Sequence, residues 1–429
     1  METIIDIDHV SFSYAGEDTR ALDDITLTVH KGDMLGIIGP SGAGKSTLAA
    51  AMSGAIPHHF GGAFYGAVRV DGRDTCEATL TDISRVVGSV LQDIDAQMVA
   101  SVVEDEVLFG LENFGVPHDQ IEERVSSILE TVGIADLRHR ELATLSGGQK
   151  QKVAIAAILA LQPRVLVLDE PTAALDPASS LVVYDTLRAI NRELGITIVV
   201  IEQKVALLSR YCGRIAVMDA GRIVLDGSPR EVFAHASELR AIGVDSPRVA
   251  RVSNSLAAAG LTDETEPCLR VDEAVALIER ICARHGVALP APAEPPVRHA
   301  PANDGAAERP AGEPILALRD VSFAYPGGGG SVRGLSLTVY PGELVGIVGQ
   351  NGAGKTTLTK LVNGLLKPAS GSVTVAGLDT RAVRVSQIAR HAATLFQNPD
   401  HQICRDTVLD EVAFGLELAG IEAAEARRR

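Results

Sequence analysis

The sequence is poor in aromatic side chains, has no tryptophan and carries no excess of positive charge. Aromatic residues make up 3% of the 429 residues, whereas 46% of the residues are apolar. Hydrophobic cores in this chain must therefore be built mainly from alanine, valine, leucine and isoleucine. The formal net charge of −16 argues against a nucleic-acid-binding protein, which normally presents a basic face.

Paired cysteines and long apolar runs are missing as well. The five cysteines form no CxxC pair, which fits a reducing cytosol. The most apolar run, VAIAAILAL at 153–161, is far shorter than the roughly 20 residues of a membrane-spanning helix. The start, METIIDIDHV, shows no basic region followed by an apolar core, so no signal peptide is visible. We expect a soluble or peripheral protein of two or three domains.

The chain contains an internal repeat. GPSGAGKST at 39–47 and GQNGAGKTT at 349–357 agree at six of nine positions, with an offset of 310. EDEVLFGLE at 104–112 and LDEVAFGLE at 409–417 agree at seven of nine positions, with an offset of 305. Two copies of one domain are therefore present. The change in offset places five extra residues in the first copy, which we assign to IPHHFGGAFYG at 56–66.

Four segments follow from this repeat. Residues 1–235 form a complete first copy, and 314–429 form the first part of a second. Between them, 236–289 is expected to be a small helical appendix, with Val271, Ala274, Val275, Ile278 and Ile281 at helical spacing and Gly286 as a helix stop. Residues 290–313 are rich in proline and alanine and are expected to be an extended linker.

The glycine-rich loops predict phosphate binding. In KGDMLGIIGPSGAGKSTLAAAMSG, an apolar strand precedes the loop and an Ala/Leu-rich helix follows it. Backbone N–H groups of such a loop surround phosphates, Lys45 reaches the β- and γ-phosphates, and Ser46 offers its hydroxyl to Mg²⁺. A turn with a solvated lysine is the alternative, and the flanking strand and helix disfavour it.

Two further motifs carry polar groups at the ends of buried elements. RVLVLDE at 164–170 is typical of a buried parallel strand with Asp169 and Glu170 at its carboxyl end, where open α/β sheets bind ligands. LSGGQ at 145–149 predicts a helix capped by Ser146 whose first turn exposes N–H groups. Taken alone, the first motif is equally explained by two solvated acids at the end of a strand. The second, taken alone, is explained by a simple helix N-cap.

Together these motifs resemble the ATP-binding cassette (ABC) ATPases, over the whole first copy and the first part of the second. The resemblance implies a P-loop NTPase fold of the α/β class, with an antiparallel β subdomain and a helical subdomain, then a linker and a partial second copy. It implies ATP and Mg²⁺ as ligands. The phosphates would be contacted by Gly39, Pro40, Ser41, Gly42, Ala43, Gly44, Lys45, Ser46 and Thr47, and by Gly349, Gln350, Asn351, Gly352, Ala353, Gly354, Lys355, Thr356 and Thr357.

The same resemblance implies roles for residues outside the loops. Tyr14 and Tyr325 would stack on adenine. Ser146, Gly147, Gly148 and Gln149 would close on the ATP of a partner cassette, which Asp176 would contact. The implied catalytic residues are Glu170, Gln92 and Gln203. The implied Mg²⁺-binding residues are Ser46, Gln92, Asp169, Thr356 and Gln397.

The segments FQNPDHQICRDTVLDEVAFGLE and GAIPHHFGGAFYGAVRVDG resemble the tandem ATPases of energy-coupling factor (ECF) transporters. This implies substrate import through integral membrane coupling and substrate-binding subunits, no nucleic-acid partner, and a peripheral position on the cytoplasmic face of the membrane. A second cassette would be supplied in cis or by dimerisation.

Two departures from the family pattern stand out. Gln203 occupies the place of a usual histidine and cannot carry a proton, which puts hydrolysis at the first loop in doubt. The second copy lacks a signature and a strand-end carboxylate pair before residue 429, so we expect a truncated tandem ATPase, weakly active alone.

Two other functions stay open. A twin-cassette protein acting on the ribosome would share the tandem arrangement, although the linker here has no basic cluster. A nucleotide-binding regulator that does not hydrolyse ATP would fit Gln203.

Overall fold

The computed structural model describes residues 2–288, 312–325, 331–396, 402–418 and 420–428. The chain divides into two compact units, Met1–Val297 and Arg298–Arg429, and each is described by itself. The linker at 290–313 falls almost wholly outside the described residues, so its extended form stays a prediction. None of the helices in the described ranges combines the length and the apolar character of a membrane span.

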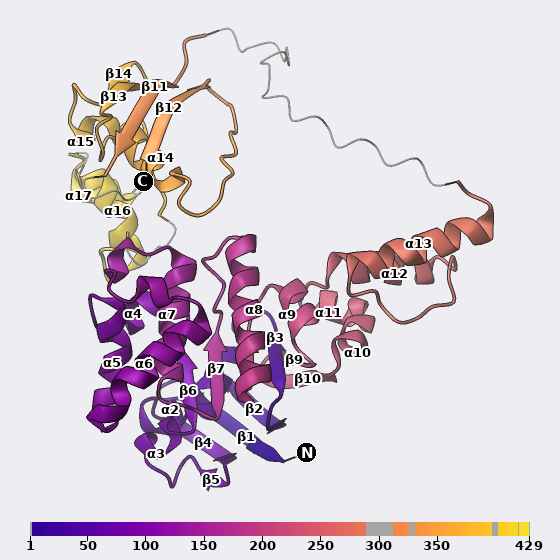
Figure 1. Cartoon of the computed structure of the whole chain (residues 1–429). Coiled ribbons are helices and arrows are strands. Elements are labelled where there is room, and N and C mark those ends of the chain that lie inside the picture. Colours follow the sequence, from indigo (N-terminus) through magenta and orange to yellow (C-terminus); the bar gives the residue numbers. More distant parts are fainter. Residues whose placement is uncertain (1, 289–311, 326–330, 397–401, 419, 429) are drawn as a thin grey trace. The chain divides into compact units, whose positions relative to one another are not determined.

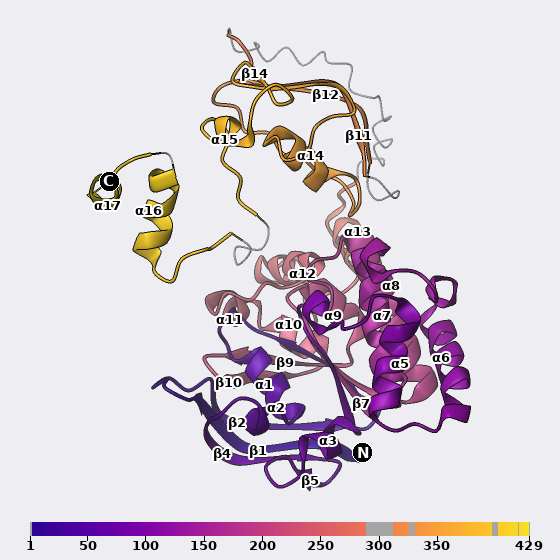
Figure 2. The ribbon, with the colours of Figure 1, turned by 90° about the vertical axis from the view of Figure 1, so that its left-hand side faces the viewer.

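Two sheets organise the first unit (Figures 1 and 2). An antiparallel sheet has the strand order β2-β1-β4-β5, and a six-stranded sheet has the order β10-β9-β3-β8-β7-β6. The strands of the first sheet are β1 (Thr3–Tyr14), β2 (Leu22–His30), β4 (Gly62–Val70) and β5 (Arg73–Asp74). Those of the second are β3 (Met34–Ile38), β6 (Val87–Val90), β7 (Val165–Asp169), β8 (Thr197–Ile201), β9 (Arg214–Asp219) and β10 (Arg222–Gly227).

The six-stranded sheet is parallel from β9 to β6, and β10 pairs antiparallel with β9. Its central strands are continuous apolar runs, as expected for strands covered on both faces. Neighbouring residues alternate between two cores: Ile37 belongs to the core shared with α1 and the antiparallel sheet, and Ile38 to the core shared with the larger helices. The predicted buried strand at 164–170 is confirmed as β7.

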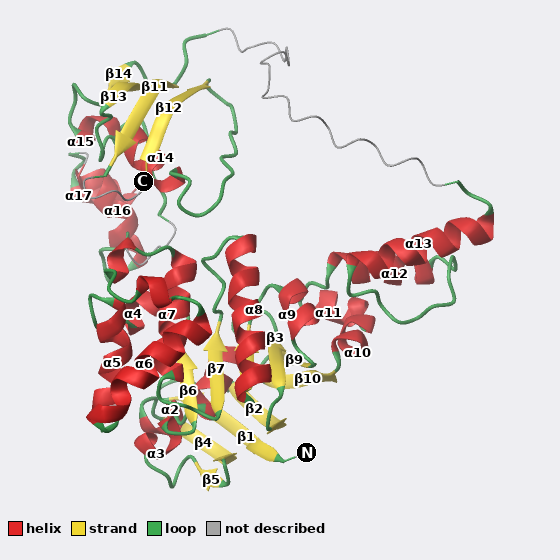
Figure 3. Ribbon diagram, viewed as in Figure 1, coloured by secondary structure: helices red, strands yellow, loops and turns green. Residues whose placement is uncertain are grey.

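Helices of the first unit cover both faces of the six-stranded sheet, and α4 to α7 gather on one side of the strands (Figure 3). Two short 3₁₀ turns lie at Ala135–Leu137 and Leu142–Thr144. The helices are α1 (Lys45–Met52), α2 (Ala55–His58), α3 (Leu80–Ser84), α4 (Ile94–Gln97), α5 (Val103–Asn113), α6 (His118–Val132), α7 (Gly147–Leu159), α8 (Pro177–Leu194), α9 (Val205–Tyr211), α10 (Pro229–Ala234), α11 (Ala236–Ala241), α12 (Arg248–Ala258) and α13 (Val271–His285).

The segment expected to be an appendix is helical, and its last helix α13 ends at a left-handed Gly286, as predicted. The predicted apolar face was partly wrong. Val271 and Val275 are exposed, whereas Ala274 and Leu277 are buried in a small core with Cys268. The reason is that the apolar contacts of α13 in this core are to α12, and contact with one helix covers only a narrow stripe of a helix. The boundaries at 235 and 289 stay a prediction.

The second unit repeats the antiparallel sheet, with strand order β12-β11-β13-β14. A small core around Leu318, Leu358 and Val373 joins this sheet to α14. The charged end of the sequence contains a short helix, α17. The elements are β11 (Leu316–Ala324), β12 (Ser331–Val339), β13 (Ser370–Val375), β14 (Leu378–Asp379), α14 (Lys355–Val362), α15 (Val385–Ile388), α16 (Val408–Leu418) and α17 (Ala423–Arg428).

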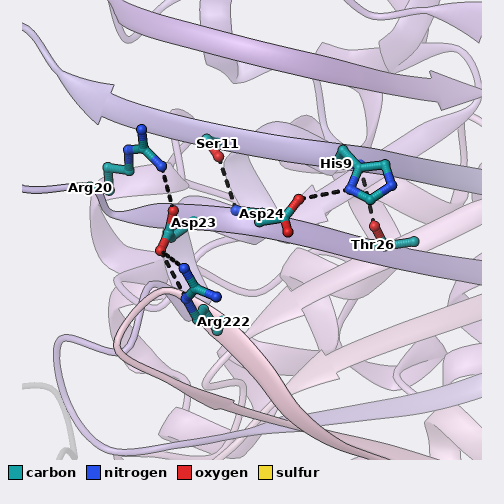
Figure 4. Close-up of polar contacts among 7 residues, drawn as sticks. All are labelled: His9, Ser11, Arg20, Asp23, Asp24, Thr26 and Arg222. Atoms are coloured by element: carbon teal, nitrogen blue, oxygen red, sulfur yellow. Dashed lines mark hydrogen bonds and ion pairs between the residues drawn. The ribbon is translucent and has the colours of Figure 1, made fainter.

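The two copies share a bulge between their first two strands. In the first unit His9 and Asp24 adopt positive φ angles of 50° and 56°. The Asp24 N–H donates to Ser11 Oγ at 2.9 Å, and the His9 N–H donates to Thr26 Oγ1 at 3.3 Å (Figure 4).

The second unit has the same arrangement with other residues. Asp320 and Gly334 have φ angles of 51° and 57°. The Gly334 N–H donates to Ser322 Oγ at 2.9 Å, and the Asp320 N–H to Ser336 Oγ at 3.0 Å. The backbone bulge and its hydroxyl acceptors therefore repeat, although the residues at its left-handed positions do not.

The place of the five extra residues is confirmed. Gly54 and Gly364 are equivalent left-handed positions (φ 74° and 75°), as are Gly66 and Gly371 (φ 85° and 79°). Gly66 follows Gly54 by 12 positions in the first copy, whereas Gly371 follows Gly364 by seven positions in the second. In the first unit the longer connection contains α2 and the start of β4.

Candidate functional site

The glycine-rich loop of the first unit lies between β3 and α1, as predicted. Gly44 adopts φ +93°, and a Cβ there would stand 2.2 Å from the carbonyl oxygen of Ala21, so only glycine fits without a shift of the backbone. Lys45 Nζ donates to the carbonyl oxygens of Gly39 and Pro40, at 2.9 and 2.8 Å. The lysine therefore lies across the loop whose N–H groups would surround a phosphate.

Asp169 lies at the carboxyl end of β7, beside this loop. Burial raises the pKa of its carboxyl group, whereas contact with Ser46 and the charge of Lys45 lower it. Burial in turn lowers the pKa of Lys45, against the opposing influence of Glu170 and Asp169. Asp169 Oδ1 is buried and has no hydrogen-bond partner among the described residues. Carboxylate and hydroxyl oxygens are preferred ligands of Mg²⁺, so this donor set fits that ion.

Three predicted catalytic residues come together at Glu170. Gln203 Nε2 donates to Glu170 Oε1 at 2.6 Å, and Gln92 Nε2 donates to Glu170 Oε2 at 3.2 Å. Glu170 also has a positive φ of 47°, a strained conformation for this residue type that is often found at functional sites. The structure thus joins the ends of β6, β7 and β8 in one polar cluster.

A second polar cluster, around Glu202, lies next to it and was not predicted from the sequence. Glu202 is 1% exposed. Its carboxylate accepts hydrogen bonds from the hydroxyl of Thr172 and from the N–H groups of Gln203 and Lys204. A glutamate directly before Gln203 was the available signal, but its burial depends on the packing of a loop 30 residues away.

Lys204 completes this cluster. Its Nζ donates to the carbonyl oxygens of Thr172 and Leu175, at 2.5 and 3.0 Å, and to Ser180 Oγ at 3.0 Å. These bonds lie on both sides of Asp176. Asp176 itself caps α8, where its Oδ1 accepts from the N–H groups of Ala178 and Ser179 at 3.0 Å. The loop that carries Asp176 is therefore fastened to the segment that carries Gln203.

The LSGGQ segment forms the start of α7, as predicted. Ser146 Oγ accepts from the Gln149 N–H at 3.4 Å, and Gln149 Oε1 accepts from the Ser146 N–H at 2.9 Å, which makes a reciprocal cap. Ser146, Gly148 and Gln149 line a hollow of about 280 Å³. Gly147 follows the cap and a Cβ there would contact Leu175. Among the described residues, the Ser146 side chain bonds to Gln149 and not to residues 39–47.

Tyr14 ends β1 close to the loop, and its hydroxyl lies 3.1 Å from Thr47 Oγ1. Its ring packs edge-on against Phe12, with centroids 4.9 Å apart. In the second unit Tyr325 packs against Phe323 in the same way, with centroids 5.0 Å apart. Both rings stand at equivalent positions of the repeat.

The second loop has the conformation of the first. Gly352 and Gly354 match Gly42 and Gly44 in φ, and Lys355 Nζ donates to the carbonyl oxygens of Gly349 and Gln350, both at 2.7 Å. Thr356 and Thr357 follow in the first turn of α14. Gln397 lies outside the described residues, so its approach to Thr356 stays a prediction.

A glutamate of the repeated segment was also missed. Glu106 Oε2 accepts from the N–H groups of Val99 and Ala100, at 3.0 and 2.8 Å. Glu411 does the same for Cys404 and Arg405, both at 2.8 Å. The sequence showed that this residue repeats, but not that it holds the end of the loop after Gln92.

Comparison with known proteins identifies the family. A family model described as ABC transporter matches residues 22–173 and 332–428. Because these matches cover more than half of the chain, it belongs to this family: it is an ABC ATPase, which binds ATP and couples its hydrolysis to transport. The predicted fold class, a P-loop NTPase with antiparallel and helical parts and two cassette segments, is confirmed.

Three similar proteins show the extent of the likeness. A protein of Caldanaerobacter subterraneus named as ABC transporter ATP-binding protein TTE1589 is 36% identical over 98% of this chain and 72% of its own length. A Bacillus subtilis protein named as HMP/thiamine import ATP-binding protein YkoD is 32% identical over 96% of this chain and 71% of its own. The solved cbiO1 from Clostridium perfringens, described as part of the ABC transporter complex cbiONQ, is 32% identical with a TM-score of 0.52, over 60% of this chain and all of its own.

Proposed function

We propose that this ATPase powers substrate import as the cytoplasmic energy-supplying subunit of an ECF-type transporter. The observation that carries the catalytic part is the convergence of Gln92 and Gln203 on Glu170, beside Asp169 and Lys45. A carboxylate held by two amide groups, next to a phosphate-binding lysine, has the parts needed to direct a water molecule at a γ-phosphate.

Each remaining residue has a role in ATP binding. Tyr14 stacks on adenine, and the loop 39–47 binds the phosphates, with Lys45 on the β- and γ-phosphates. Ser46, Asp169 and Gln92 would hold Mg²⁺, which neutralises charge on the phosphate oxygens when it is bound. In the second unit, Tyr325, the loop 349–357 and Gln397 have the corresponding roles, with Thr356 and Gln397 for the metal.

Glu170 acts as the general base, and Gln203 orients it. An amide can hold a carboxylate or a phosphate oxygen but cannot take up a proton. The proton of the attacking water therefore has Glu170 as its acceptor, and Gln203 keeps the carboxylate Oε1 in place. Because Gln203 orients Glu170 but cannot take up a proton itself, we expect slow hydrolysis at the first loop and unchanged ATP binding.

The signature of α7 is proposed to serve a partner cassette. Ser146 and its exposed helix start would close on the phosphates held by another loop, that of Lys355 or that of a second copy of the chain. Asp176, at the start of α8, would contact the same partner. Sites shared between cassettes make turnover rise more steeply than linearly with protein concentration, and Ser146→Arg should abolish that rise.

Import rests on the relatives named above, one of which is named for HMP/thiamine import and another as part of a transporter complex. Integral membrane subunits would then supply substrate specificity. The test is purification of the tagged chain from detergent-solubilised membranes of its source cells. We expect a polytopic membrane protein at fixed stoichiometry that stimulates ATP hydrolysis by the chain. Recovery on ribosomes, released by salt, would favour the twin-cassette alternative and contradict this proposal.

A further inference from the structure

A cationic cavity lies between the helical segment 236–285 and the rest of the first unit. It has a volume of about 590 Å³, and its lining includes Arg188, Arg210, Arg230 and Arg270, with Asp272 and Glu273 as its acidic members. The four arginines come from α8, α9, α10 and the residue before α13. A cluster of four guanidinium groups is unexpected in a chain with a net charge of −16.

Two of these arginines have their charge balanced by the acids. Arg230 donates to Glu273 Oε1 at 2.8 Å and to the carbonyl oxygen of Pro267 at 2.9 Å. Arg270 donates to Asp272 Oδ1 at 3.0 Å. Both acidic side chains of the lining therefore already have an arginine partner. Arg230 fastens the start of α13 to the cassette, and its role in the absence of any ligand is structural.

The other two arginines lie against one aromatic ring. The guanidinium carbons of Arg188 and Arg210 are 4.7 and 5.3 Å from the ring centroid of Tyr211. Arg188 donates to Asp185 at 2.9 Å, and the Tyr211 hydroxyl donates to the same carboxylate at 2.8 Å. The guanidinium of Arg210 has no hydrogen bond or ion pair within the described part of the chain, although its backbone belongs to α9. It is the surplus cation of the cavity.

We propose that this cavity binds a small phosphorylated molecule, with Arg210 as the principal contact and Arg188 and Arg270 beside it. Arginine presents a planar fork of N–H donors that matches two oxygens of a phosphate. The volume lies within the range of about 300–1,000 Å³ that is usual for small-ligand sites. A bound phosphate would bridge α9 of the cassette to the start of α13. This site is separate from both glycine-rich loops, and it does not depend on the transport role.

The test uses the full chain with Lys45→Ala and Lys355→Ala, so that neither loop takes up the probe. Calorimetric titration with inorganic pyrophosphate at constant ionic strength should give saturable binding at one site. Arg210→Gln on that background should weaken the affinity about tenfold or more, as expected for the loss of a charge-assisted contact. Arg240→Gln is the matched control, because it removes the same charge from α11, away from the cavity lining.

Hydrogen exchange supplies a second measurement. Pyrophosphate should protect the amides of residues 270–273 in the Lys45→Ala/Lys355→Ala chain and leave them unprotected once Arg210→Gln is added. The proposal is overturned by non-saturable binding, by unchanged affinity in Arg210→Gln, or by an equal loss in Arg240→Gln. That last result would mean that only the overall charge matters.

Discussion

The two glycine-rich loops of this chain have nearly the same sequence and the same local geometry, yet their surroundings differ. In the first unit, MLGII at 34–38 is β3, paired on both sides by β8 and β9 and fully covered, with Ile37 at 0% exposure. In the second, LVGIV at 344–348 is assigned to no strand among the described residues, and Ile347 is 52% exposed.

The difference separates what a local motif determines from what its neighbours determine. The loop conformation and the bonds of Lys45 and Lys355 follow from glycine positions and the start of a helix, and they appear in both units. The strand before the loop needs hydrogen-bonded partners on each side, because an isolated strand leaves its backbone groups and apolar side chains in water. An identical apolar pattern therefore gives a strand in one unit only.

The largest expected effect concerns the catalytic cluster, which the described residues contain only in the first unit. Glu170→Gln should reduce single-turnover hydrolysis about 10²–10⁴-fold, or roughly 3–5 kcal/mol of barrier. ATP affinity should stay near that of the parent, because Lys45 and the loop are unchanged. Rapid-quench hydrolysis with equilibrium binding measures both. Parent-like turnover would show that the second unit, or another residue, supplies the base.

The second prediction tests the two strands with a matched pair of substitutions. Ile37→Ala removes a fully buried side chain and should destabilise the first unit by about 2–5 kcal/mol. Ile347→Ala, at the equivalent position, should cost less than about 0.5 kcal/mol. Urea unfolding, monitored by hydrogen exchange at the amides of each unit, gives the free energy of unfolding of the two units separately. Equal costs would mean that residues 344–348 are covered in solution and that the two strands before the loops do not differ in burial.

The third prediction compares nucleotide affinity at the two loops. Lys45→Ala should weaken binding of a fluorescent ATP analogue by about 10–100-fold, the loss expected for a charged hydrogen-bond donor. Lys355→Ala should change it less than about threefold, because its loop is not supported by a buried strand and must be ordered on binding. Lys31→Ala, at a partly exposed lysine that is paired with Glu2 and lies outside both loops, serves as the charge control. A larger effect of Lys355→Ala would reverse the ranking of the two sites.

The smallest effect concerns the bulge, where the first unit has an ion pair and the second has none at the equivalent positions. A hydrogen bond and the charge of Asp24 raise the pKa of His9. A raised pKa stabilises the folded state below the unfolded value of about 6.5, and the gain is lost as pH rises through the folded pKa. His9→Asn should therefore lower the melting temperature of the first unit slightly at pH 5.5 and leave it unchanged at pH 8.5.

Asp24→Asn should reproduce this shift, and the double variant should add little to it. The second unit, with Asp320 and Gly334 at these positions, should show no matching change between the two pH values. A shift of the same size at pH 8.5 would indicate that His9 acts through backbone strain rather than through its charge.

The sequence predicts the parts of the site that depend on local chemistry. The loop of Lys45, the strand end at Asp169 and the cap at Ser146 each need only a few adjacent residues. The approach of Gln92 and Gln203 to Glu170 followed from family resemblance, since these residues lie 78 and 33 positions from it in the chain. Lys204 and Glu106 were missed because they bond to backbone groups that only the folded chain brings near. Glu202 was missed because its burial depends on Thr172, 30 residues away in the chain.

The hydrogen bonds of Lys204 connect the loop 172–176 rigidly to the segment that carries Gln203. If Asp176 touches a neighbouring cassette, as we propose, pressure on that loop is transmitted through Lys204 and Glu202 to the amide that holds Glu170. Arrival of a neighbour would then adjust the aim of the base before any chemistry begins. Such a link would make hydrolysis by each cassette depend on the presence of its partner cassette, and would limit ATP hydrolysis by cassettes that are not paired.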